Sequence, residues 1–241
     1  EVALTIPADG YIAAEISSYQ MEVTADFHPH VATVLNVTPD HIVRHGSLEE
    51  YQRMKERMFA QQKSRDYLVL NYDDARVKDM ANRASAHVVF FSRQVHLHEG
   101  AYLEGDMLTI AWNGEDYPLC TISELGIKGA HNVENALAAA MTAFLAGCTA
   151  EEMVPVLKSF RGVEHRIEYV RTLDGVEYYN DSKATNTDSA IKALETFENG
   201  IVLLAGGDDK MTDLTDFLSR VKERVTDMVL IGAAADRFEQ E

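Results

Sequence analysis

The feature of this sequence that most constrains its fold is a regular alternation of short apolar runs with amphipathic stretches. The apolar runs are rich in Val, Ile and aromatic residues, and most are too continuously apolar for a sheet with one face in water. This pattern predicts strands at residues 11–16, 31–37, 67–70, 87–91, 176–179, 201–204 and 228–231. The chain is therefore expected to adopt an α/β fold, with a mostly parallel sheet flanked by helices.

Two dipeptides predict hairpins that interrupt the parallel pattern. Asn113-Gly114 lies between two apolar runs of the first part of the chain, and Asp174-Gly175 lies between two runs of the second part. Both suit a type I′ turn, whose two central residues need positive φ. The second hairpin follows Phe160-Arg-Gly-Val163, where a helix is expected to end. A domain boundary is therefore expected close to this segment.

The charge balance limits the partners of the surface as a whole. The 241 residues contain 22 Lys and Arg against 39 Asp and Glu, so the net charge is 22 − 39 = −17. Nucleic acids and anionic membranes attract cationic proteins, so both are excluded as general partners. An anionic small molecule can still bind where cations and backbone N–H groups gather locally.

Neither a membrane span nor a secretory signal is expected. The longest mostly apolar stretch, 136–148, has about 13 residues, whereas a spanning helix needs about 20. The first residues carry no cationic leader, and Cys120 and Cys148 show neither metal-ligand nor redox spacing. These features predict a cytoplasmic protein.

Three polar clusters follow apolar runs in the first part of the chain, where open α/β sheets bind their ligands. They are Glu15-Ile-Ser-Ser-Tyr-Gln20, Asn36-Val-Thr-Pro-Asp-His41 and Gly129-Ala-His-Asn-Val-Glu-Asn135. A carboxylate such as Glu15 suits Mg²⁺, and the amides of Asn132 and Asn135 suit a purine edge. Each cluster also has a plainer interpretation, namely a strand-terminal turn, a solvated loop and a helix capped by Asn132.

Three further clusters lie in the second part. They are His165-Arg166, Asn180-Asp-Ser-Lys-Ala-Thr-Asn186 and Ala205-Gly-Gly-Asp-Asp-Lys210. The second precedes an expected helix, so its backbone amides and Lys183 can meet an anion at the positive helix end. The third has two glycines that admit close backbone approach, although an ordinary strand-to-helix turn uses the same residues.

Together the six clusters resemble the Mur ligase family, and the resemblance covers essentially the whole chain. The segment 180–186 is typical of the branch that adds D-glutamate. The resemblance implies a central ATPase domain at residues 1–162 and a Rossmann-like C-terminal domain at 163–241, the latter incomplete. The family's phosphate loop, G-x-x-x-x-G-K-[ST], is not found in these residues. We therefore expect a fragment of a longer enzyme, inactive alone and monomeric.

The implied reaction joins D-glutamate to UDP-N-acetylmuramoyl-L-alanine at the expense of ATP, through an acyl phosphate, in peptidoglycan synthesis. The resemblance implies Mg²⁺ at Glu15 and His41, with Lys55 as a carbamylated lysine that adds a carboxylate-like ligand. The implied nucleotide residues are Asn132, Asn135, His165, Arg166 and Asp181. The implied substrate residues are Ser17, Gln20 and His41 for the muramoyl substrate, and Lys183, Thr185, Asp208 and Lys210 for D-glutamate.

Val43 departs from the family pattern, which often has Asp two residues after the His of the second cluster. We expect Val43 to change how the second cluster is held in place, without loss of that site. Two other functions stay open. The chain can belong to another amide ligase of the superfamily, such as a folylpolyglutamate synthase, or it can be a non-catalytic nucleotide-binding module.

Overall fold

The first sheet of the computed structural model has six strands, and four of them run parallel. The structure describes residues 5–7, 9–39, 42–209 and 211–241. The order is β1-β2-β3-β4-β5-β6, in which β1 to β4 are parallel neighbours and β4 to β6 pair in antiparallel fashion. These strands are β1 (Val31–Val34), β2 (Tyr67–Asn71), β3 (His87–Ser92), β4 (Gly100–Glu104), β5 (Met107–Trp112) and β6 (Glu115–Thr121).

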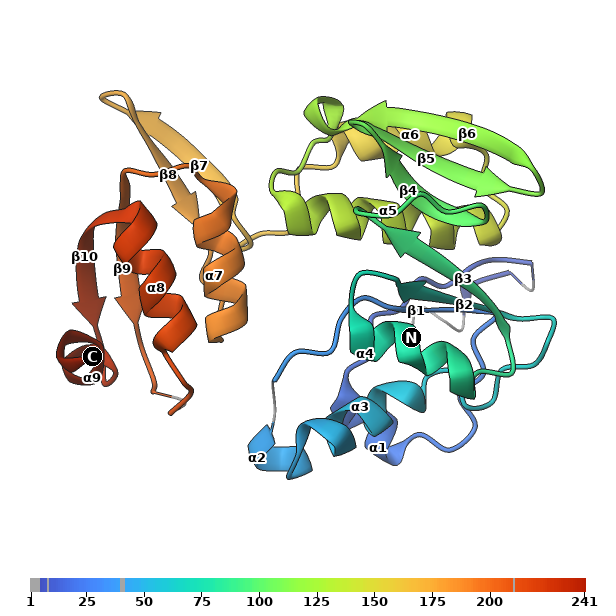
Figure 1. Cartoon of the computed structure of the whole chain (residues 1–241), viewed down its shortest axis with the longest axis horizontal. Helices are drawn as coiled ribbons and strands as arrows, with labels where there is room; N and C mark the ends of the chain where they lie inside the picture. Colours follow the sequence, from blue (N-terminus) through green and yellow to red (C-terminus); the bar gives the residue numbers. More distant parts are fainter. Residues whose placement is uncertain (1–4, 8, 40–41, 210) are drawn as a thin grey trace.

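Helices lie on both faces of this sheet (Figure 1). They are α1 (Ser18–Val23), α2 (Ile42–His45), α3 (Leu48–Glu56), α4 (Ala75–Asp79), α5 (Ala130–Leu145) and α6 (Ala150–Ser159), with short 3-10 helices η2 (Met80–Arg83) and η3 (Ile122–Glu124). In the described part of the chain, no helix combines the length and the apolar character needed to cross a membrane.

The remaining strands form two small sheets that follow α6. An antiparallel hairpin joins β7 (Glu168–Leu173) to β8 (Val176–Asn180), and a parallel pair joins β9 (Ile201–Gly206) to β10 (Val225–Ile231). The helices of this part are α7 (Thr187–Thr196), α8 (Thr215–Arg224) and α9 (Ala235–Gln240). Figure 1 shows this part beside the start of α5.

The central strand β2 is buried on both faces. Val69 packs in one apolar cluster with Leu137 of α5, whereas Leu68 and Leu70 pack in a second cluster with Val77 of α4. All three β2 side chains are 0% exposed. Full burial of each such side chain contributes about 2 kcal/mol, so α5 and α4 are held to opposite faces of the sheet.

The α/β fold class predicted from the sequence is confirmed. The runs at 31–37, 67–70, 87–91, 176–179, 201–204 and 228–231 all contain strands, although β1 stops at Val34. Both predicted hairpin turns are present, with positive φ at each central residue: Asn113 54°, Gly114 81°, Asp174 51° and Gly175 82°.

The predicted strand at 11–16 is wrong, and strand β4 was not predicted. Residues 11–16 belong to no strand, and Tyr11 is 74% exposed. No described strand pairs with them, and an unpaired segment lacks the hydrogen bonds that hold a strand. Strand β4 begins at Gly100, where an added Cβ would lie 2.1 Å from the Phe90 carbonyl oxygen. The close approach of Gly100 to strand β3 is a tertiary contact. The sequence around Gly100 therefore gave no clear prediction of a strand.

Asp66 is a buried carboxylate at the end of the sheet where β2 begins. It is 3% exposed and accepts hydrogen bonds from His28 Nε2 (2.6 Å), His30 Nδ1 (3.2 Å) and the Lys63 backbone N–H (2.7 Å). The hydrogen bond from His28 holds the pKa of Asp66 well below its usual range, against the opposing effect of burial. The ionised form of Asp66 therefore ties the segment before β1 to the segment before β2.

We expect Asp66→Asn to lower the free energy of unfolding by about 1–3 kcal/mol at pH 7, because a buried hydrogen-bonded charge is lost. A carboxyl with a depressed folded-state pKa stabilises above its unfolded pKa of about 3.9, and this contribution disappears as the pH falls further. The difference from wild type should therefore be full at about pH 5 and shrink below about pH 4.

Urea unfolding followed by the fluorescence of Trp112 measures this difference, since its ring contacts those of Tyr67 and His87 in the same sheet. Asp236→Asn, which neutralises an exposed carboxylate, is the control and should change stability little at either pH. A difference between Asp66→Asn and wild type that grows as the pH falls below about 4 would contradict the assignment.

Candidate functional site

Lys55 lies at the end of the sheet where β1 ends. It is carried by α3, whose N-cap Ser47 accepts a hydrogen bond from the Glu50 N–H. The Lys55 Nζ donates to the Asn36 carbonyl oxygen over 2.8 Å and lies 4.9 Å from the centre of the Tyr51 ring. The lysine predicted from the resemblance therefore meets the backbone of the second polar cluster.

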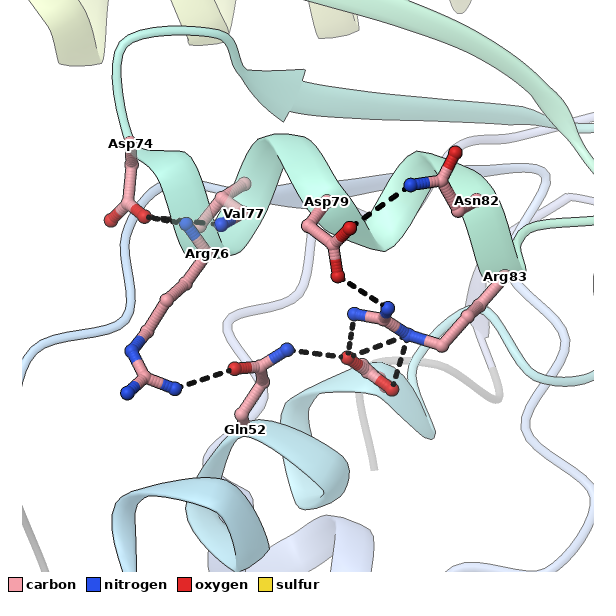
Figure 2. A network of polar contacts seen from close by, with 8 residues as sticks. Gln52, Asp74, Arg76, Val77, Asp79, Asn82 and Arg83 are labelled. Atoms are coloured by element: carbon pink, nitrogen blue, oxygen red, sulfur yellow. Dashed lines mark hydrogen bonds and ion pairs between the residues drawn. The ribbon is translucent and has the colours of Figure 1, made fainter.

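Charged side chains hold α3 against its neighbours α4 and η2. Arg83 pairs with Glu56 of α3 over 2.7 Å and with Asp79 of α4 over 2.6 Å. Arg76 donates to Gln52. Figure 2 shows the contacts of Arg76 with Gln52 and of Arg83 with Asp79. Exposed pairs of this kind stabilise a fold by less than about 1 kcal/mol each. Their main effect is to set the position of the helix that carries Lys55.

The first polar cluster forms the approach to α1. Ser17 is the N-cap of this helix: its Oγ accepts from the Gln20 N–H, and its own N–H donates to Gln20 Oε1 over 2.8 Å. Glu15 is exposed in the segment before the cap. The structure therefore joins Ser17 to Gln20, and no described contact links Glu15 to Lys55.

Two predicted site residues, His41 and Lys210, lie outside the described residues. Val43, the departure from the family pattern, is fully exposed on α2. Asp208 is exposed after β9. The groups expected around His41 and Lys210 therefore stay predictions.

The third cluster opens α5. The N-cap is Gly129, with φ 95°, so the interpretation of Asn132 as the cap is wrong. Asn132 lies inside the first turn, where its Nδ2 donates to the Lys128 carbonyl over 2.7 Å and its Oδ1 accepts from Asn135 Nδ2 over 3.1 Å. Within the described residues no side chain caps this helix start. Its first N–H groups and positive dipole end suit a phosphate.

Two of the clusters after α6, at residues 165–166 and 180–186, meet at the base of the β7–β8 hairpin. Asp181 Oδ1 accepts from the Ile167 N–H over 3.0 Å, and the Lys183 N–H donates to the His165 carbonyl over 3.0 Å. The Thr185 N–H donates to the Lys183 carbonyl over 2.9 Å. The structure thus brings four of the predicted site residues, His165, Asp181, Lys183 and Thr185, into one loop cluster.

His131 connects this loop cluster to α5. Burial lowers the pKa of the His131 imidazole, and the nearby cations Lys192 and Arg166 lower it further. Burial also raises the pKa of Asp181. The start of α5 therefore faces both cations and carboxylates of the following part of the chain, because Glu195 and Asp188 act on the pKa of His131 in the opposite direction.

Two features of this site were not predicted from the sequence. His131 stood within a quoted motif, yet it was not predicted as a site residue. The turn after β2, Asn71-Tyr-Asp-Asp74, was not singled out, although it is a polar cluster directly after an apolar strand. That signal is the one used for the other clusters, so it could have identified this turn.

Comparison with known families gives two matches, which together cover most of the chain. The Mur ligase middle domain matches residues 7–143, and the Mur ligase glutamate ligase domain matches residues 165–241. The chain therefore belongs to the Mur ligase family.

Curated relatives share about two fifths or more of their aligned residues with this chain. The UDP-N-acetylmuramoylalanine–D-glutamate ligase of Pelotomaculum thermopropionicum is 45% identical over 227 residues, covering 94% of this chain and 50% of the relative. That of Alkaliphilus metalliredigens is 42% identical over 238 residues, covering 99% and 52%. The chain spans about half the length of the curated relatives it matches.

Solved structures of the family share the fold. MurF from Acinetobacter baumannii superimposes with a TM-score of 0.64 at 19% identity, covering 91% of this chain and 49% of that one. MurC from Thermotoga maritima gives a TM-score of 0.64 at 19% identity, covering 93% and 50%. At this level of identity the likeness concerns the fold alone.

We expect Gly129→Ala to destabilise the chain more than Gly200→Ala. Both glycines have positive φ, 95° and 76°, so an alanine is strained at either position. A Cβ at residue 129 would lie 2.8 Å from Thr196 Oγ1 on α7 and 2.9 Å from the His131 ring, whereas no described atom lies within 4 Å of a Cβ at residue 200. Overpacking should add about 1–3 kcal/mol at residue 129.

Calorimetric unfolding of both variants measures the difference. Equal decreases in stability in the two variants would show that α7 does not pack tightly against the start of α5.

Proposed function

We propose that the complete polypeptide joins D-glutamate to UDP-N-acetylmuramoyl-L-alanine with hydrolysis of ATP to ADP and phosphate. The observation that carries this proposal is the 42–45% identity over nearly the whole chain to ligases of that name. The segment Asn180-Asp-Ser-Lys-Ala-Thr-Asn186, typical of the D-glutamate branch, agrees with it.

The proposed reaction has two steps. The carboxylate of the muramoyl substrate takes the terminal phosphoryl group of ATP, which releases ADP and forms an acyl phosphate. The amine of D-glutamate then attacks the acyl carbon, inorganic phosphate leaves and the amine loses a proton, so an amide remains. The protein has to hold two anions together and offset the phosphate charge.

The nucleotide is proposed to bind between the start of α5 and the loop cluster after α6. Asn132 and Asn135 would face the adenine, Arg166 the phosphates and Asp181 the ribose, with His165 close by. The uncapped helix start supports this placement.

The other substrates are assigned to either side of the nucleotide. Lys183, Thr185 and Lys210 would bind the carboxylates of D-glutamate, with Asp208 supporting that site. Ser17, Gln20 and His41 would face the muramoyl substrate. In a chain with a net charge of −17, local cations are what a dianionic amino acid needs.

The family implies Mg²⁺, and the proposed ligands fit this ion if Lys55 is carbamylated. The described residues hold no group of three or more His, Cys, Asp or Glu side chains that could bind a metal ion. Glu15 offers a carboxylate, His41 an imidazole, and Lys55 an oxygen ligand only as a carbamate. A carbamate keeps one N–H, so it can still donate to the Asn36 carbonyl that Lys55 contacts. Bound Mg²⁺ would offset the phosphate charge.

The domain boundary is proposed at residues 162 and 163. Helix α6 ends at Ser159 and β7 begins at Glu168, so the boundary falls in the connection between two separate sheets. The family matches, which end at 143 and begin at 165, are compatible with it.

The complete polypeptide should release phosphate from MgATP only when both UDP-N-acetylmuramoyl-L-alanine and D-glutamate are present. A coupled phosphate assay that omits each substrate in turn tests this dependence. Release driven equally well by another amino acid, or no release at all, would overturn the proposed function.

Lys55→Ala and Lys55→Arg should each lower kcat by about 100-fold or more, because neither side chain can supply a carbamate oxygen at the reacting phosphates. Lys63→Ala, which removes an exposed lysine after the same helix, is the control and should keep wild-type kcat. Mass spectrometry of the native protein in bicarbonate should show the carbamate, and an active Lys55→Arg variant would rule it out.

A further inference from the structure

The turn that follows β2 carries one buried and two partly buried polar side chains, Asn71, Asp73 and Asp74, whose contacts go beyond those of an ordinary strand-to-helix turn. Asn71 is the last residue of β2 and is 5% exposed. Its Nδ2 donates to the Leu35 carbonyl over 3.0 Å, while its Oδ1 accepts from the Asp73 N–H over 2.9 Å. Both ends of this amide are therefore used, one of them on the segment that follows β1.

Asp74 divides its two oxygens between a helix cap and that same segment. Its Oδ1 accepts from the Arg76 and Val77 N–H groups over 2.9 and 3.0 Å and so caps α4 (Figure 2). Its Oδ2 accepts from the Val37 N–H over 3.1 Å. The cap accounts for only one oxygen, so the second contact requires another explanation.

Asp73, between them, reaches the opposite side of the turn. Its carboxylate accepts from Ser92 Oγ over 2.6 Å and from the Arg93 N–H over 2.7 Å, both just at the end of β3. Arg93 in turn pairs with Glu134 of α5 over 3.2 Å. This one turn therefore links the ends of three neighbouring strands and the helix that carries Asn132 and Asn135.

The segment held by Asn71 and Asp74 is the one that Lys55 contacts. Strand β1 ends at Val34, so the following backbone has left the sheet ladder. Asn71 binds the residue before Asn36, Asp74 binds the residue after it, and Lys55 Nζ binds the Asn36 carbonyl itself. The position of that carbonyl is set from both sides.

We propose that Asn71 and Asp74 are positioning residues for the ligase reaction. They hold the Asn36 carbonyl where it orients the Nζ of Lys55. This inference rests on the proposed function, because it concerns the same site. Neither residue contacts a substrate; each acts through the backbone of residues 35–37.

Two variants of the complete polypeptide separate this role from stability. Asp74→Ser keeps a side-chain cap for α4 but is too short to bind Val37 as well. Asn71→Asp keeps the shape and the acceptor for Asp73, yet an ionised carboxylate cannot donate to the Leu35 carbonyl. Thr149→Ala is the control, because it removes the N-cap of α6, which packs elsewhere.

In both variants we expect kcat to fall by about 10- to 100-fold, as for other small displacements of reacting groups. The KM for D-glutamate should stay within about twofold, because its proposed residues belong to the part after α6. Hydrogen exchange at the Val37 amide should become faster in Asp74→Ser. Thr149→Ala should keep wild-type kcat and wild-type exchange at Val37.

A wild-type kcat in Asp74→Ser and Asn71→Asp, both folded by Trp112 fluorescence, would overturn the positioning role and leave the proposed function standing. A loss of kcat in Asp74→Ser without faster hydrogen exchange at the Val37 amide would also overturn it. An inactive wild-type polypeptide would instead overturn the proposed function. If Asp74→Ser fails to fold, Asn71→Asp decides by kcat and by exchange of the peptide 35–37.

Discussion

The burial of β2 on both faces is the constraint on which the rest of the first sheet depends. Leu68, Val69 and Leu70 are inaccessible to solvent, with α5 on one side and α4 on the other. A polar group along this strand would be buried without a partner, at a cost of several kcal/mol. Polar side chains are therefore confined to the two ends of the strand, and both ends carry them.

The two ends of β2 use their carboxylates differently. Before the strand, the Asp66 carboxylate accepts hydrogen bonds from two histidines and a backbone N–H, and so joins neighbouring segments of the chain. After the strand, Asn71 and Asp74 bind backbone that has left the ladder, beside a lysine that reaches the same backbone. Only the second end lies where parallel sheets place their ligands, and Lys55 meets the backbone of the second polar cluster there.

Much of the fold was predictable because its signals are local. Asn113-Gly114 and Asp174-Gly175 specify hairpins by backbone preference alone. The run at 11–16 misled because a strand also needs a neighbour to pair with, and no described strand supplies one. The expected cap at Asn132 was wrong because the helix is capped at Gly129, three residues earlier, and no local rule distinguished the two positions.

The sequence by itself determined the class of fold, the hairpin turns and the polar clusters that mark the family, because these depend on periodicity and on residues close together in the chain. Only the tertiary structure decided which clusters meet. Lys55 reaches Asn36 across 19 positions, and Asp74 reaches Val37 across 37. Such contacts depend on which strands become neighbours, and that is settled by packing both faces of the sheet at once.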